Sequence, residues 1–80
     1  MNKIIVTGLF ICNLLLSSVI IRGTVIDEEL NPIPYANIFI KNSFDGTSSD
    51  SNGQFLFETT EIGEKTIIIS FIGFETYEGI

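Results

Sequence analysis

The chain has 80 residues, a net charge of −6 and no histidine, which limits it to one small acidic domain. All ten acidic residues lie in residues 22–80, where Arg22, Lys41 and Lys65 are the only basic ones, so this part carries −7. That charge excludes nucleic-acid binding, which needs a basic surface to neutralise phosphates. Without histidine, and with Cys12 as the single cysteine, histidine-based triads and Cys/His zinc sites are excluded too. We therefore predict no catalytic, cofactor-binding or metal-binding residues.

The N-terminal segment has the layout of a secretory signal peptide. Lys3 and the α-amino group form a positive end, residues 4–21 contain no charge, and two serines follow the most apolar run. The usual pair of small residues at the cleavage site is missing, and the uncharged stretch is also long enough for an uncleaved membrane anchor. A buried strand or helix is the third alternative. We predict a signal peptide or membrane anchor at residues 1–20, with Cys12 as an inert apolar residue inside it.

The first strand expected after this segment covers residues 21–27, a run rich in β-branched residues. Two prolines within residues 31–34 then exclude a helix and a central strand, because proline lacks the N–H group that either would need. Residues 35–41 alternate with a period of two, which predicts a strand with one apolar face and with Phe39 on the other face.

Residues 42–53 are dense in Ser, Asp, Asn and Gly, and we expect them to form turns. The strongest signals are Asp45-Gly46 and Asn52-Gly53, because such pairs accept a positive φ at low cost. A brief edge strand is expected at residues 46–49.

Three further strands are expected at residues 54–59, 66–72 and 74–80, with a break at Gly73. The middle one is nearly all apolar, which is typical of a central strand covered on both faces. No window has a 3.6-residue period that favours a helix. Five or six short strands separated by turns predict an all-β sandwich. Because the chain stops within a strand, we expect the closing strand to be missing.

Four sequence blocks follow one another from residue 23 onward. They are residues 23–27 (GTVID), 31–38 (NPIPYANI), 46–55 (GTSSDSNGQF) and 69–74 (ISFIGF). Over residues 21–78, their order and spacing resemble the carboxypeptidase regulatory-like domain, also called the carboxypeptidase D regulatory-like domain. The departures from the family pattern are Asn31 in place of glycine, Ser49 in place of threonine and Phe74 in place of tyrosine.

The resemblance implies a transthyretin-like, immunoglobulin-like β-sandwich at residues 21–80 that is C-terminally truncated. In Gram-negative bacteria such domains often follow a signal peptide and precede the plug and barrel of a TonB-dependent outer-membrane receptor. We therefore expect a non-catalytic exported module in the periplasm or at the outer membrane. Its partner would be another protein or the rest of a larger receptor, and not a nucleic acid. It would meet the membrane only through the leader or anchor segment or a missing barrel.

Two alternatives stay open. The chain could be a stand-alone exported module that binds a glycan or a peptide. It could also be the accessory regulatory domain of an exported metallocarboxypeptidase, although no zinc-ligand set is present in the sequence.

The acidic residues do not predict a site. An EF-hand loop aligned on Asp50 lacks the acidic first and last ligands, so we expect Asp50 to cap a turn instead. The acids at 27–29, and Glu61 with Glu64, are expected to be exposed turn residues whose pKa nothing shifts.

The aromatic residues divide into two groups. Period-two placement predicts core packing for Phe55, Phe57, Phe71, Phe74 and Tyr77. Tyr35 and Phe39 are the aromatic residues expected to be exposed, and we predict them as the contact residues for a ligand or partner.

Overall fold

The structure is a computed structural model that describes residues 2–13, 18–61 and 63–80. Within these ranges all regular secondary structure is β-strand, as predicted. The strands are β1 (Asn2–Lys3), β2 (Ile5–Asn13), β3 (Val19–Ile26), β4 (Asn37–Ile40), β5 (Gly46–Ser48), β6 (Gln54–Thr59), β7 (Ile67–Ser70), β8 (Phe74–Glu75) and β9 (Tyr77–Gly79).

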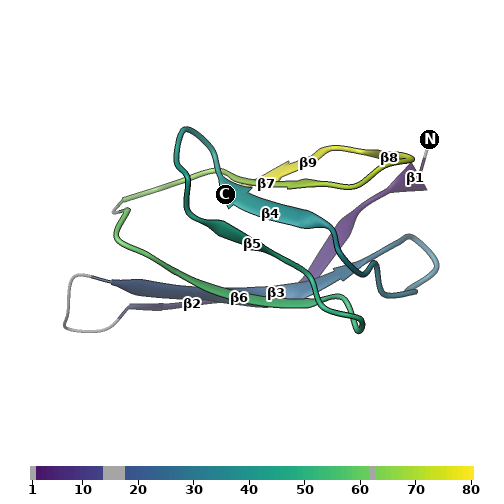
Figure 1. The fold of residues 1–80 in the computed structure, drawn as a ribbon, viewed down its shortest axis with the longest axis horizontal. Helices are drawn as coiled ribbons and strands as arrows, with labels where there is room; N and C mark the ends of the chain where they lie inside the picture. The colour runs from purple at the N-terminus through teal and green to yellow at the C-terminus, as the bar shows by residue number, and fades with distance from the viewer. Residues whose placement is uncertain (1, 14–17, 62) are drawn as a thin grey trace.

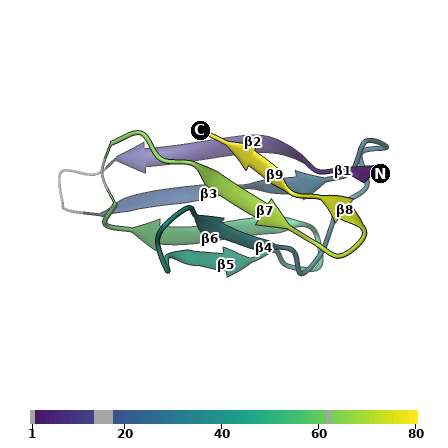
Figure 2. The same ribbon diagram turned by 90° about the horizontal axis from the view of Figure 1, so that it is seen from above.

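Two sheets face each other, as Figures 1 and 2 show. One contains β2, β3 and β6 in that order, and the other contains β5, β4, β7 and β9. All pairings within these two sheets are antiparallel. The short β1 pairs in parallel with β8, and the chain then passes from there to β2 in the first layer. The predicted two-layer β-sandwich is confirmed.

The core lies between the sheets and follows from the alternation along each strand. In β6, Phe55, Phe57 and Thr59 are buried, whereas the residues between them are exposed, as predicted. The facing sheet buries Ile38, Ile40, Ile67 and Ile69. Burial of one such aliphatic or phenylalanine side chain stabilises the fold by roughly 1.5–3 kcal/mol, so the alternation holds the two layers together.

The strand predicted at residues 66–72 is central in its sheet but is covered on one face only. β7 pairs with β4 on one side and with β9 on the other. Its outward residues Ile68 and Ser70 are half-buried, and Phe71 and Ile72 follow the end of the strand and are exposed. The predicted burial on both faces is therefore wrong, because a two-layer sandwich has no third layer to cover the outer face.

The turn predicted at Asn52-Gly53 is present and requires its glycine. Gly53 has a φ of 74°, and a Cβ atom there would lie 2.6 Å from the carbonyl oxygen of Val25. The Asp50 carboxylate accepts the backbone N–H groups of Asn52 and Gln54 at 2.8 and 2.9 Å. Asp50 therefore caps this turn, as predicted.

The other predicted turn lies earlier in the chain than Asp45-Gly46. Asn42 has a φ of 65°, and the Ser43 N–H donates to the carbonyl oxygen of Ile40 at 3.1 Å. Asparagine can take this left-handed conformation, so the positive φ falls on Asn42. Gly46 already begins β5, where the backbone of β4 approaches too closely for a side chain.

The apolar N-terminal segment forms a strand in the structure. β2 lies antiparallel to β3 along its length, with an irregularity between Thr7 and Phe10. A strand is part of the third alternative of the sequence analysis, but residues 5–8 of β2 are exposed or half-buried and not buried as that alternative has them. Three predictions stay predictions: the cleavage of residues 1–20, the domain boundary at residue 21 and the missing closing strand. The side chain of Cys12 lies outside the described part of the structure. Among the described residues, no helix has the length and apolar character needed to cross a bilayer.

Candidate functional site

The predicted contact residues Tyr35 and Phe39 lie on the outer side of the sheet that contains β4. Tyr35 precedes β4 and exposes 67% of its surface. Phe39 lies within β4 and points outward, because its neighbours Ile38 and Ile40 are buried in the core. Its side chain is half-buried, so the predicted exposure is found for Tyr35 and not for Phe39. Its cross-strand partner in β5 is Gly46, which has no side chain that could cover the ring.

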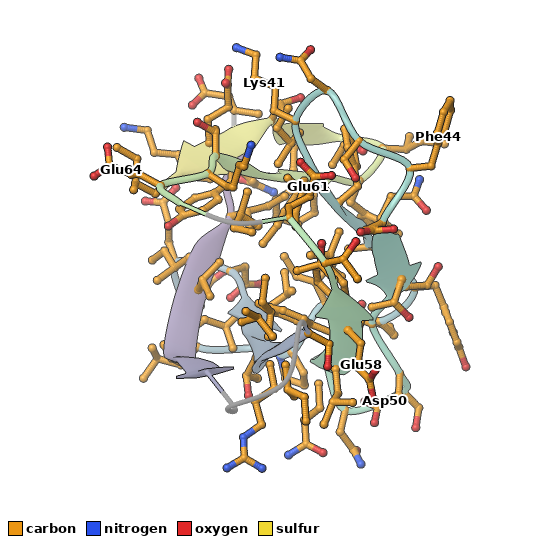
Figure 3. The ribbon with its side chains drawn as sticks, turned by 90° about the vertical axis from the view of Figure 1, so that its left-hand side faces the viewer. Lys41, Phe44, Asp50, Glu58, Glu61 and Glu64 are labelled. Carbon is orange, nitrogen blue, oxygen red and sulfur yellow. The ribbon has the colours of Figure 1, made fainter. Side chains whose placement is uncertain are left out.

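Two shallow hollows on this outer side meet at Asn37. The first, of about 390 Å³, is lined by Tyr35, Ser70, Phe71 and Ile72 in addition to Asn37. The second includes Phe39, Phe44 and all three residues of β5. Phe44 is fully exposed, and Figure 3 shows its side chain pointing away from the ribbon. The outer apolar surface is defined here as Tyr35, Phe39, Phe44, Phe71 and Ile72.

Ser49 fixes the loop that presents Tyr35. The Ser49 residue is buried, and its Oγ donates to the carbonyl oxygen of Ile33 at 2.7 Å and accepts the N–H of Ala36 at 2.9 Å. The Tyr35 N–H donates to the carbonyl oxygen of Ser49 at 3.0 Å, and the Ser49 N–H donates to that of Ala36 at 3.0 Å. These bonds tie the segment before β4 to the segment after β5.

Tyr35 has a strained backbone conformation. Its φ is 61°, which for a residue with a side chain costs on the order of 1–3 kcal/mol. Core packing does not explain the strain, because most of the ring lies in solvent. An exposed aromatic side chain on a strained loop that is held by buried hydrogen bonds is typical of a binding site.

The aromatic residues predicted for the core divide between two environments. Phe55 and Phe57 are buried, and Phe74 and Tyr77 are partly buried against the core, which confirms the prediction for these four. The prediction is wrong for Phe71, which is exposed. β7 ends at the preceding residue, so Phe71 leaves the strand's alternation, and its ring packs against that of Phe74 with centroids 5.9 Å apart.

Two residues of this region were not predicted from the sequence to contribute to a site. Phe44 follows Asn42 and Ser43 within a polar turn, and a lone aromatic residue in such a stretch is a usable signal for an exposed ring. Ser49 gives no comparable signal, because its partners Ile33 and Ala36 are 16 and 13 positions away in the sequence.

Asp27 caps a turn through its carboxylate. The Asp27 carboxylate accepts the backbone N–H of Asn31 at 2.9 Å and that of Glu29 at 2.8 Å. These bonds lower the pKa of Asp27 below its ordinary value, and the bond from the Asn31 N–H has the largest effect on the pKa. The expectation that nothing shifts the pKa of these acids is therefore wrong for Asp27. In the part of the chain that the structure describes, no three Asp, Glu or Cys side chains gather as metal ligands would.

Comparisons with known proteins agree with the sequence blocks. A family model described as the CarboxypepD_reg-like domain matches residues 21–79. The chain is also similar to "TonB-dependent receptor P39" of Formosa agariphila, with 34% identity over 58 residues. This similarity covers 72% of the chain and 6% of that receptor. No solved structure matches. Because the family model spans most of the chain and the fold is an all-β sandwich, the chain belongs to the carboxypeptidase regulatory-like domain family.

Proposed function

We propose that the chain is a non-catalytic, exported module at the N-terminus of a TonB-dependent outer-membrane receptor of a Gram-negative bacterium, and that it contacts another protein through the outer apolar surface. The similarity to a TonB-dependent receptor supports the receptor assignment. Because the aligned stretch is a small part of that receptor, transport itself would belong to other parts of such a protein.

The observation that favours protein contact is the exposed Tyr35 on its strained loop. Phe44 and Ile72 extend the same apolar side, and both are almost fully exposed. Aromatic residues are enriched at the energetically important positions of protein interfaces. β5 lies beside this surface and pairs only with β4 in the described sheets, so its other edge could accept a strand from a partner.

Cell fractionation and co-purification test this proposal together. The native protein should be found in the periplasm or the outer membrane and should co-purify with one envelope protein. Tyr35→Ser together with Phe44→Ser should abolish the co-purification without changing the location. Leu56→Ser is the matched control, because Leu56 is 56% exposed on the opposite sheet. A cytoplasmic location would contradict the receptor assignment, and an unchanged partner in the double variant would contradict the contact surface.

A further inference from the structure

β5 is the last strand of its sheet, so one of its edges is open. It pairs only with β4 in the described sheets, and Figure 2 shows it at the border of its layer. Two backbone bonds between the β4 and β5 segments flank the strand. The Ile40 N–H donates to the carbonyl oxygen of Asp45, and the Ser49 N–H donates to that of Ala36, both at 3.0 Å. These bonds fix the phase of the ladder between the two strands.

This phase decides where each residue of β5 directs its backbone groups, because bonded and non-bonded pairs alternate in an antiparallel ladder. Positions 45, 47 and 49 face β4, whereas Gly46 and Ser48 direct their N–H and C=O groups away from it. In the described part of the chain, the only bond to these groups is a long one, from the Thr47 hydroxyl to the carbonyl oxygen of Ser48 at 3.5 Å. The open edge therefore offers donors and acceptors at the spacing of an extended polypeptide.

A hollow lies on each side of this edge. The hollow on the outer side, of about 410 Å³, is lined by Phe39, Phe44 and β5 itself. Gly46 is the cross-strand partner of Phe39 and has no side chain, so a residue that pairs with Gly46 can reach the Phe39 ring. The hollow on the side to which Thr47 points, of about 530 Å³, is lined mainly by polar residues, among them Gln54. Successive side chains of an added strand would point into the two hollows in turn.

The backbone groups and the charge of the chain decide what this edge accepts. Alternating N–H and C=O groups are matched by another extended polypeptide, and neither a sugar nor a lipid surface repeats them at this spacing. A second copy of this chain is disfavoured, because each copy carries a net charge of −6 and the two would repel each other. The chemistry of the edge therefore fits a segment of a different protein that has no net negative charge.

We propose that the outer edge of β5 is a strand-acceptor site for an extended segment of the partner protein. The segment pairs antiparallel, as the neighbouring strands of this sheet do. Its residue opposite Gly46 is apolar and contacts Phe39 and Phe44, and its residue opposite Thr47 is polar. This inference rests on the proposed function, which supplies the partner protein, and adds the conformation and the side-chain pattern of the segment that binds.

The first test uses the wild-type chain and synthetic peptides. The probe is a short fluorescent peptide of alternating threonine and leucine residues with a lysine at each end, and binding is measured by anisotropy. In the proposed pairing, the leucine N–H groups face β5 and the threonine N–H groups face solvent. N-methylation of the leucines should therefore weaken binding at least about tenfold, because each lost bond contributes about 0.5–1.5 kcal/mol. N-methylation of the threonines is the matched control and should leave the affinity unchanged.

The second test changes the protein. Ser48→Pro removes one donor from the open edge and leaves the bonds to β4 intact, and proline is tolerated where an edge strand faces solvent. This variant should bind the unmodified probe at least about tenfold more weakly, with the circular-dichroism spectrum of the wild type. Ser48→Ala keeps the N–H group and should bind the probe as the wild type does. If Ser48→Pro failed to fold, the N-methylated peptides would still decide the question on the unchanged chain.

Three results would contradict the strand-acceptor site: no binding of the probe to the wild-type chain, equal binding of the three peptides, or full binding by a folded Ser48→Pro variant. None of them would affect the receptor assignment, which the cellular location tests. In sedimentation equilibrium the wild-type chain should be a monomer. A dimer that Ser48→Pro dissociates would show that a second copy occupies the edge, and it would contradict our proposal too.

Discussion

The two sheets bury similar residues on their inner faces and present different ones on their outer faces. In the sheet of β2, β3 and β6, the exposed positions of β6 are Gln54, Leu56 and Glu58, and Ile5 of β2 is exposed as well, so this sheet exposes two aliphatic side chains and no aromatic one among the described residues. Outside the sheet of β5, β4, β7 and β9 lie the apolar side chains of Tyr35, Phe39 and Phe71. The stability of a sandwich requires an apolar inner face but no particular outer face. A difference between the outer faces therefore points to function.

The largest expected effect compares the inner and outer positions of one strand. Ile69 of β7 is completely buried and its neighbour Ile68 is half-buried on the outer side. Ile69→Ala should lower the free energy of unfolding by about 2–5 kcal/mol, because it leaves a cavity between the sheets. Ile68→Ala should have a smaller effect, about 1 kcal/mol or less. Urea denaturation of both variants measures the difference, and equal midpoints would contradict the assignment of the two faces.

The next comparison is between two glycines with positive φ. Gly53→Ala should destabilise by about 2–3 kcal/mol, because its Cβ would meet the carbonyl oxygen of Val25 and its φ is 74°. Gly63→Ala has a similar φ, 83°, but open space around the new Cβ, so it should cost only about 1 kcal/mol. Thermal unfolding of the two variants separates steric overlap from backbone strain. If Gly63→Ala were the more destabilising substitution, the expected overlap between a Cβ atom at position 53 and the carbonyl oxygen of Val25 would be contradicted.

Ser49 should connect stability to the contact surface. Ser49→Ala removes the hydroxyl that bonds Ile33 and Ala36 and should cost about 1–3 kcal/mol. It should also weaken partner binding, because the loop that presents Tyr35 loses its support. Ser49→Thr keeps the hydroxyl and should preserve both properties. Chemical denaturation and co-purification measure them, and full partner binding by Ser49→Ala would show that the loop does not need this support.

The smallest expected effect is on the pH dependence of stability, through Asp27. The lowered pKa of Asp27 means that its charged form is favoured in the folded state. Its stabilising contribution is present above its pKa in the unfolded chain, which is about 3.9. The contribution is lost as the pH falls through the lower pKa that Asp27 has in the folded protein. Asp27→Asn should therefore be slightly less stable than the wild type at pH 6, with the difference shrinking below about pH 4. A difference that stays constant from pH 6 to pH 2 in thermal melts would contradict this assignment.

The fold was largely predictable from the sequence, because a period of two is visible within β4 and β6. The outward direction of Phe39 was predictable for the same reason, because it lies on the outer face of the alternation in β4, although its side chain is half-buried and not exposed as predicted. The exposure of Tyr35, which precedes that strand, was predicted correctly. Three features were not predictable, because they depend on contacts between distant segments. Pairing of β2 with β3 is hidden by the export-signal pattern, the bonds of Ser49 span more than ten positions, and the exposure of Phe71 depends on where β7 ends.

Site-specific photo-crosslinking in cells tests most directly whether the outer apolar surface is where this module meets its partner. A photoreactive amino acid at position 35, 39 or 44 should yield a crosslink to one and the same envelope protein. The same group at position 54 or 56, on the other sheet, should yield none. Crosslinks from positions 54 and 56, with none from positions 35, 39 and 44, would contradict the central claim.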